Sequence, residues 1–177
     1  MRIEIRTPSL SDEAAFLDKV NRDRNFHRPW VYPPSSSEAF RGYIERIKRD
    51  SHRGYLICER GTDGLVGVVN INEIVFGSFR SAFLGYYVFA DYARQGLMSE
   101  GMSLVTRSAF RELKLHRLEA NIQPENHSSI ALVRRLGFER EGFSPGYLKV
   151  GGRWRDHERW ALLADHRKPS IGLGRGA

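Results

Sequence analysis

A short basic turn containing glycine joins a strand-like run to a helix-like run at Tyr92–Gly101, which reads Tyr-Ala-Arg-Gln-Gly-Leu-Met-Ser-Glu-Gly. The first N–H groups of a helix lack intrahelical partners and lie at the positive end of the helix dipole. The segment therefore predicts an anion site, most naturally for a pyrophosphate. Gly96 lets the backbone approach phosphates closely, and Arg94 and Gln95 add a charge and an amide. Because the Walker and dinucleotide patterns are absent, an ordinary surface turn is the alternative on this segment alone.

The elements that must position this turn follow from periodicity and end signals. The predicted strands are 2–6, 55–59, 65–75, 82–89, 117–122, 138–142 and 154–163, and the predicted helices are 14–20, 38–48, 98–113 and 126–135. Residues 26–34 hold prolines at three positions and are predicted to form a loop. An antiparallel meander followed by strand–helix–strand indicates an α+β fold. We expect one domain over residues 1–168 and a disordered Gly-rich tail at 169–177.

Four motifs, including the turn itself, occur in a fixed order along the chain. They are Asn25–Trp30 near the start, Gly96-Leu97-Met98-x-Glu100 in the turn, Asn126–Ser129 followed by Gly137-Phe138 and Glu141-Gly142, and Gly152–His157 near the end. Together these segments resemble the GNAT acetyltransferases, and within them the RimJ/RimL branch, closest to its RimJ type of ribosomal-protein alanine N-acetyltransferases. Two positions depart from the common pattern of the turn: Ala93 replaces an Arg or Gln, and Met98 replaces a small residue.

This resemblance implies a GNAT fold: a mixed, mostly antiparallel sheet with splayed strands, flanked by helices. It also implies acetyl-CoA as co-substrate, with the pantetheine lying along the splayed strand. The residues that the resemblance assigns to acetyl-CoA are Val88 and Phe89 through their main chain, the turn residues Arg94, Gln95, Gly96, Leu97, Met98 and Ser99, and Asn126, Ser129 and Arg134.

Ser129 is the candidate acid that protonates the departing thiolate, with a plain helix-start serine as the alternative. Tyr147 is the next candidate for this role. The branch's glutamate position appears here as Gly146, so a direct carboxylate base at that place is absent. For the general base the sequence offers Glu73, Tyr86 or Tyr147, or a water held by Glu73 or by backbone groups. An α-amino group has a pKa near ~8, so a strong base is not obligatory.

The acceptor side is assigned to Trp30, Tyr86 and Tyr147. A Ser-His-Asp triad using Asp156 and His157 is excluded, because adjacent residues on an extended strand point to opposite faces. Asp156 is expected instead to fix the last hairpin by hydrogen bonding.

Composition bounds the remaining expectations. The net charge of +7 favours anionic partners such as coenzyme A phosphates or a ribosome, although the arginines are spread along the chain. Cys58 is the single cysteine, so no intrachain disulfide can form. Neither a membrane-length apolar run nor a signal peptide is apparent, and we expect a cytoplasmic protein. The histidine and cysteine spacings predict no metal site.

The resemblance therefore implies an acetyl-CoA-dependent N-acetyltransferase that acts on the N-terminal amine of a protein, and we expect that protein to be a ribosomal protein. Two alternatives stay open at this point: acetylation of a small amine such as an amino acid, polyamine or antibiotic, and a non-enzymatic module that binds CoA or RNA. The oligomeric state is not predicted.

Overall fold

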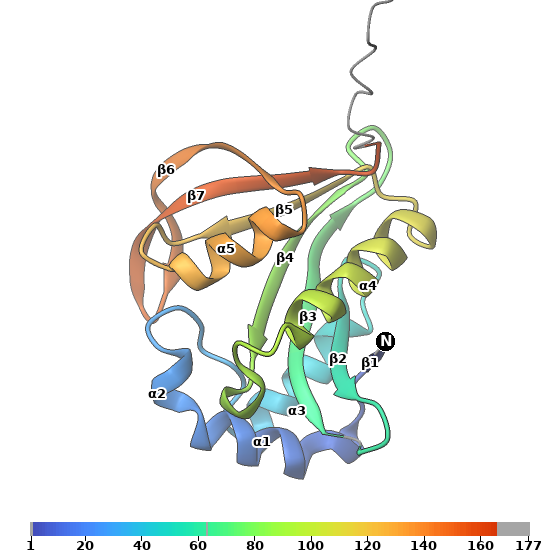
Figure 1. Cartoon of the computed structure of the whole chain (residues 1–177), viewed down its shortest axis with the longest axis vertical. Helices are drawn as coiled ribbons and strands as arrows, with labels where there is room; N and C mark the ends of the chain where they lie inside the picture. The colour runs from blue at the N-terminus through green and yellow to red at the C-terminus, as the bar shows by residue number, and fades with distance from the viewer. Residues whose placement is uncertain (1, 63, 166–177) are drawn as a thin grey trace, which may run out of the picture.

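The computed structural model describes residues 2–62 and 64–165, and the predicted tail at 169–177 lies outside them. The described chain contains a seven-stranded sheet in the order β1-β2-β3-β4-β5-β7-β6 (Figure 1). Its strands are β1 (Ile3–Arg6), β2 (Arg53–Glu59), β3 (Leu65–Val75), β4 (Ser81–Val88), β5 (Arg117–Ile122), β6 (Glu139–Val150) and β7 (Arg153–Leu163). Only β4 and β5 pair in parallel, and the other neighbours pair antiparallel.

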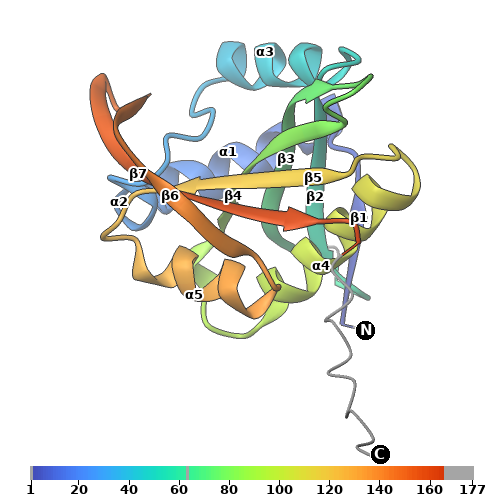
Figure 2. The ribbon, with the colours of Figure 1, turned by 90° about the horizontal axis from the view of Figure 1, so that it is seen from above.

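Helices cover both faces of this sheet (Figure 2). On one face lie α1 (Glu13–Arg22), α2 (Arg24–His27) and α3 (Ser37–Ile47), and on the other α4 (Leu97–Arg111) and α5 (His127–Arg135). Each face has its own apolar core. Met102 and Val105 of α4 pack with Trp160 on one side, whereas Phe16 of α1 packs with Phe40 of α3 on the other. The predicted α+β class and GNAT fold are thus confirmed.

The longest strand differs from the sequence prediction, which ended it at residue 142. In the structure β6 continues to Val150, because it stays paired with β7 through two irregularities, between Arg140 and Gly142 and between Ser144 and Leu148. Such bulges absorb extra residues and bend a strand without ending it. The predicted loop at 26–34 likewise begins late, since a helical turn occupies Arg24–His27. That one domain spans residues 1–168 stays a proposal.

The sheet opens between β4 and β5. Their pairing covers only Ser81–Leu84 against Arg117–Ala120. Beyond Leu84 the two strands diverge, β4 continuing toward α2 while β5 turns aside (Figure 1). The predicted splayed strand is therefore β4.

Close packing of α4 on the sheet depends on a missing side chain. A Cβ at Gly101 would lie 2.2 Å from Cδ1 of Ile57, which is fully buried, whereas a Cβ at Gly42 of α3 would meet nothing within 4 Å. Both glycines are inside helices, so alanine gains similar helix propensity at each, about 1 kcal/mol. We expect Gly42→Ala to raise the free energy of unfolding above that of the wild type. We expect the free energy of unfolding of Gly101→Ala to be lower than that of Gly42→Ala by about 1–3 kcal/mol, the usual cost of overpacking.

Urea unfolding of the two variants checks this expectation. Equal stability of Gly42→Ala and Gly101→Ala would contradict the packing argument.

Candidate functional site

The turn that leads into α4 has the geometry of an anion site. Gly96 is the N-cap of α4 and adopts a left-handed conformation, φ 77°, which glycine tolerates without strain. Glu100 N donates to Gly96 O at 3.2 Å, which closes the first helical bond. The N–H groups of Leu97, Met98 and Ser99 precede it and have no partner within the helix. The side chains of Leu97 and Met98 are buried in the core, which anchors this end of the helix.

The turn is held from both ends. Arg2 donates from Nη2 to Gln95 O at 3.1 Å and from Nε to Glu100 Oε1 at 2.8 Å. Gln95 Nε2 donates to Asp91 O at 2.7 Å, so this predicted cofactor contact uses its amide to shape the turn. Arg94 is exposed, adopts φ 61° and has no ion pair within the described chain. Few non-glycine residues adopt that conformation, and those that do cluster at functional sites.

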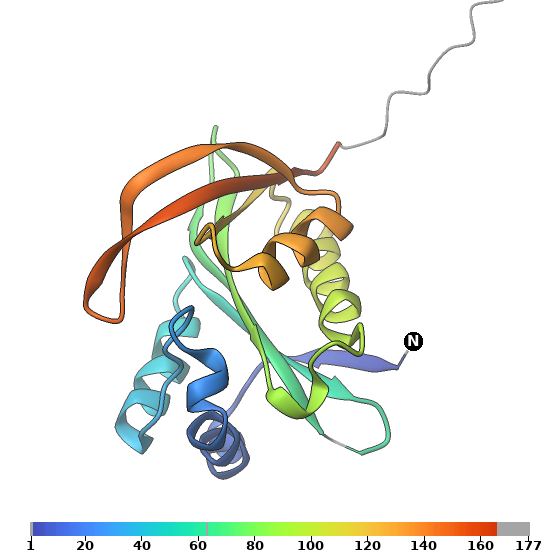
Figure 3. The same cartoon turned by 60° about the vertical axis from the view of Figure 1, so that its left-hand side comes forward.

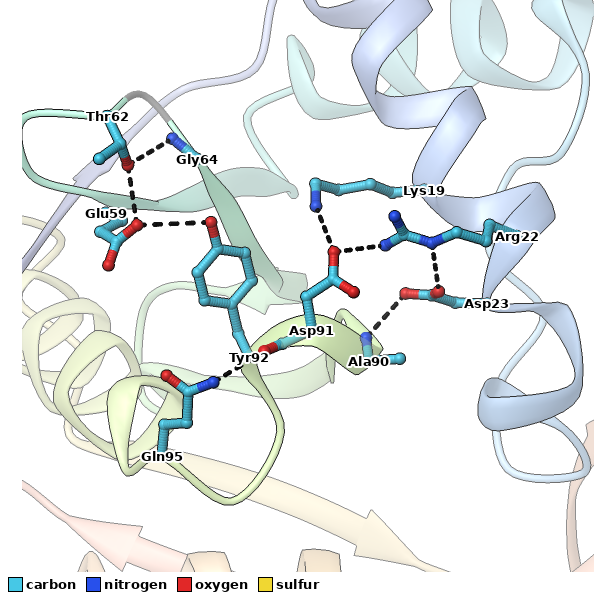
Figure 4. A network of polar contacts seen from close by, with 10 residues as sticks. All are labelled: Lys19, Arg22, Asp23, Glu59, Thr62, Gly64, Ala90, Asp91, Tyr92 and Gln95. Carbon is cyan, nitrogen blue, oxygen red and sulfur yellow. Dashed lines mark hydrogen bonds and ion pairs between the residues drawn. The ribbon is translucent and has the colours of Figure 1, made fainter.

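Charged groups of α1 fix the segment just before the turn (Figure 4). Asp91 accepts from Arg22 Nη2 at 2.7 Å and from Lys19 Nζ at 3.3 Å, while Asp23 accepts from Ala90 N at 2.7 Å. The hydrogen bonds from Arg22 and Lys19 lower the pKa of Asp91. Asp23 is 5% exposed, so its bond to the backbone is shielded from water. The segment that leads into the turn is therefore fixed to α1 and to the residue that follows it.

The splayed end of β4 leaves main-chain groups without a strand partner. Phe89 N donates to Val66 O at 2.9 Å, so Phe89 faces β3. Because main-chain direction alternates along an antiparallel strand, the N–H and C=O groups of Tyr86 and Val88 point away from β3, into the gap. His27 Nε2 occupies one of these groups, Val88 O, at 2.9 Å.

The two predicted main-chain contacts to the pantetheine thus differ. Val88 keeps an N–H that faces the gap. Phe89 has no free N–H, and its carbonyl already accepts from Tyr92 N at 3.0 Å. A role for Phe89 through its main chain therefore has no support in this geometry.

Two predicted site residues meet on the α5 side of the gap. Tyr86 Oη and Ser129 Oγ lie 2.6 Å apart, although 43 residues separate them in the chain. Asn126 Oδ1 accepts from Ser129 N at 3.2 Å, so Asn126 caps α5 as predicted and places Ser129 in its first turn. Burial raises the pKa of Tyr86 well above its ordinary value, while the hydrogen bond from Ser129 lowers it in part. The phenol is therefore neutral at pH 7, and the pair holds two hydroxyl protons beside the gap.

Other predicted residues lie apart from this pair. Glu73 is exposed, 3.5 Å from His52 Nε2, at the end of β3 where β4 and β5 are still paired. Arg134 lies over the Trp160 ring at 5.1 Å, which is a contact within the fold. Tyr147 faces His157 with ring centroids 6.2 Å apart. None of these three contacts Ser129 within the described chain, and their predicted roles stay predictions.

The last hairpin agrees with the sequence argument against a triad. Asp156 Oδ1 accepts from Gly146 N at 2.7 Å, which fixes the bulged part of β6 as expected. His157 Nδ1 donates to Arg155 O at 2.9 Å and does not bond Asp156. Because the carbonyl can only accept, this bond assigns the proton of the neutral ring to Nδ1. Burial lowers the pKa of His157, so the ring is neutral at pH 7.

The tip of the β6–β7 hairpin reaches the segment after α2 (Figure 3). A Cβ at Gly151 would lie 2.4 Å from Tyr32 Oη, so the glycine makes room for the tyrosine ring. Arg28 lies over the same ring at 5.2 Å. Trp30, assigned to the acceptor side, is half-buried in this segment and donates from its N to His27 O at 3.0 Å. A hollow of about 500 Å³ lies between this segment and α3, and Tyr32, Tyr43 and Arg46 are among the residues that line it.

Four residues that hold the site in place were not predicted from the sequence: Arg2, Asp23, His27 and Asp91. Asp91 is adjacent to the recognisable turn and His27 lies within the Asn25–Trp30 motif, but the sequence assigned neither of them this role. Arg2, Asp23 and His27 bond to the turn, to Ala90 and to β4 from distant parts of the chain, so no local signal marks these bonds.

Among residues 2–62 and 64–165, no group of three or more His, Cys, Asp or Glu side chains could hold a metal ion. No helix in the same ranges is long and apolar enough to cross a membrane.

Comparisons with known proteins agree with this geometry. The family model described as acetyltransferase (GNAT) domain matches residues 2–139. The [ribosomal protein uS5]-alanine N-acetyltransferase of Escherichia coli is 32% identical over 95% of this chain and 91% of its own length. The spermidine N(1)-acetyltransferase of Escherichia coli is 25% identical over 92% and 89%. Among solved structures, Mycobacterium smegmatis RimJ in complex with CoA-disulfide has a TM-score of 0.85 and 26% identity, covering 94% of this chain and 84% of that one.

The geometry of the turn gives a direct test. Gly96→Val forces a β-branched residue into a left-handed conformation and places a side chain where phosphates must approach the N–H groups of α4. We expect the affinity for coenzyme A, measured by calorimetry, to fall at least about tenfold.

Gly77→Val is the matched control. Gly77 has φ 71° and open space around it, but lies in the turn between β3 and β4. It carries similar strain without approaching α4, so coenzyme A affinity should be retained. Wild-type affinity in a folded Gly96→Val protein would exclude the turn as the binding site.

Proposed function

Because this chain belongs to the GNAT acetyltransferase family, we propose that it acetylates the N-terminal amine of a protein, and that the acceptor is a ribosomal protein. The chain is an N-acetyltransferase that uses acetyl-CoA. The alternative of a non-enzymatic binding module is therefore set aside. What is proposed here is the acceptor and the roles of the residues.

One observation carries the choice of acceptor. The uS5-alanine enzyme is 32% identical over 95% of this chain, whereas the spermidine enzyme reaches 25% over 92%. Both alignments span nearly the whole chain, so the difference is not one of coverage. The higher identity supports a protein N-terminus, and the polyamine is kept as the second candidate.

The residues present fit acetyl-CoA. The N–H groups at the start of α4 and the unpaired cation of Arg94 suit a pyrophosphate. The outward N–H and C=O of Tyr86 and the outward N–H of Val88 suit the amide groups of a pantetheine, because each lacks a strand partner, whereas Val88 O is already bonded to His27. Bound there, acetyl-CoA supplies a thioester, which is an activated acyl group.

Ser129 and Tyr86 serve the leaving group. As the thioester breaks, a thiolate forms and needs a proton. Ser129 Oγ donates that proton, and Tyr86 Oη, 2.6 Å away, returns one to Ser129. The proton that the attacking amine loses to solvent then restores the phenol, so no net charge remains on the pair. A hydroxyl pair of this kind relays a proton without a fixed charge in the gap.

The acceptor amine must be neutral to attack. With a pKa near ~8, an α-amino group is neutral in an appreciable fraction at pH 7, so an ordered water is sufficient to take its proton. Glu73 has the least support as the base, because its carboxylate is exposed and faces His52.

Substituting the hydroxyl pair tests the leaving-group role. We expect Ser129→Ala to lower kcat by about 100-fold or more, the lower end of general acid catalysis, with little change in coenzyme A affinity. Tyr86→Phe removes the second hydroxyl, and we expect a smaller loss of kcat because Ser129 remains. Stopped assays of thiol release at saturating acetyl-CoA give kcat.

Ser128→Ala is the matched control, since Ser128 is the adjacent helix-start serine and is exposed. Its kcat should equal that of the wild type. If Ser129→Ala behaved like Ser128→Ala, Ser129 would be a helix-start residue and the acid would lie elsewhere.

An acceptor panel tests the proposed substrate. We expect mass spectrometry to detect acetylated N-termini on short peptides beginning with Ala, Ser or Met, with kcat/KM above that for spermidine, free amino acids or an aminoglycoside. Trp30→Ala should raise KM for the peptide and leave KM for acetyl-CoA unchanged, because Trp30 belongs to the segment beside the hairpin tip.

Phe79→Ala controls for loss of an aromatic side chain, since Phe79 is 75% exposed in the β3–β4 turn. Efficient acetylation of spermidine with no peptide modified would reject the protein acceptor and leave the polyamine.

A further inference from the structure

Three polar side chains occupy one face of β5 and β7. Asn121 of β5 is the register partner of Arg159 of β7. Arg155 lies four residues before Arg159 on the same strand, and the irregularities of this hairpin are extra residues of β6, so both arginines lie on one face of β7.

This face is the one turned away from α4 and α5. Ala120 and Trp160, which alternate with Asn121 and Arg159, belong to the core beneath those helices. With Leu84 in register with Ala120, the Asn121 side shares its face with Tyr87, which packs in the α1–α3 core. Trp160 and α5 lie on the other side of the sheet, so Asn121 and Arg159 occupy the face that these groups do not cover.

Buried polar atoms without partners collect on this same face. Within the described chain, the buried side-chain atoms that lack a hydrogen bond are Asn121 Oδ1, Arg155 Nε, Arg159 Nε and His27 Nδ1. His27 packs against Tyr87 and Phe89, so it faces this side of the sheet as well. Buried polar groups in folded proteins are nearly always paired, so a cluster of exceptions marks groups whose partners, whether water, an ion or a ligand, come from outside the chain.

The two guanidinium groups also lack ion pairs at contact distance within the described chain. The neighbouring carboxylates are engaged: Arg117 donates to Glu119 Oε1 at 2.7 Å and to Glu141 Oε1 at 2.9 Å. Arg117, with a smaller contribution from Arg159, lowers the pKa of Glu141. The free charge on this face is therefore positive.

Space for Arg159 depends on a glycine. A Cβ at Gly142 would lie 2.5 Å from Arg159 Nη2, so the guanidinium rests over the bare backbone of β6.

We propose that Arg155 and Arg159 are the specificity-determining residues of the acceptor site, binding the carbonyl or carboxylate oxygens of the residues that follow the acetylated amine. This inference rests on the proposed protein acceptor. A guanidinium donates several N–H groups in a fixed plane that matches such oxygens. A polyamine carries further ammonium groups, which these cations repel. The preferred substrate is a peptide N-terminus with an acidic residue at its second or third position.

Peptide pairs that differ only in charge test this. We compare kcat/KM for hexapeptides beginning with Ala and carrying Glu, Gln or Lys at positions two and three. The wild type should prefer the Glu peptide over the Lys peptide by about tenfold or more, the usual effect of a hydrogen bond to a charged group. Arg155→Gln and Arg159→Gln should each bring the ratio of Glu to Gln peptide toward one, with KM for acetyl-CoA unchanged.

Arg140→Gln is the matched control. Arg140 is in β6 of the same hairpin and pairs with Glu158. Glu158 in turn accepts a hydrogen bond from Trp160, so this pair lies on the face opposite to Arg155 and Arg159. The substitution removes the same charge and should preserve the peptide preference. Thermal unfolding of each variant verifies that it is folded.

The outcomes separate the two proposals. Peptides acetylated with equal efficiency whatever their charge, or a preference unchanged in both arginine variants, would overturn the role of Arg155 and Arg159 and leave the protein acceptor standing. Acetylation of spermidine with no peptide modified would overturn both.

Discussion

The loss of pairing between β4 and β5 beyond Leu84 and Ala120 is the constraint on which the site depends. A strand that leaves its neighbour exposes N–H and C=O groups, and such groups are costly inside a protein unless they find partners. The fold satisfies one of them itself, since His27 donates to Val88 O. The others face the gap and are available to a ligand whose own amide groups can act as a strand.

The same gap divides the chemistry between the two faces of the sheet. On the α5 side, Asn126 caps the helix and places Ser129 against Tyr86, beside the gap. On the opposite side, Asn121 of β5 and Arg155 and Arg159 of β7 carry buried polar atoms that have no partner within the described chain. Each face carries its own apolar core, so each set of polar groups is fixed by independent packing.

Residues outside the turn at Tyr92–Gly101 hold it in place. Arg2 binds Gln95 and Glu100, and Asp23 holds Ala90 from α1. These bonds fix the turn before a ligand arrives, so less conformational entropy is lost on binding. Because α1 is followed directly by α2, which carries His27, one part of the chain supports both the segment before the turn and the splayed end of β4.

The sequence by itself determined the features that depend on local physics. Gly96 before an apolar periodic run specified a turn and a helix start, and Asn126 specified a cap, because both effects act within a few residues. The order of strands and helices, with the resemblance to a known family, specified the fold. Tertiary structure alone decided the length of β6, which was predicted to end at residue 142 but stays paired with β7 through bulges as far as Val150. It also decided the meeting of Ser129 with Tyr86, the clamp of Arg2, and the engagement of Phe89 within the sheet. These contacts join residues far apart in the chain, and no local preference encodes which distant groups the packed sheet brings within hydrogen-bond distance.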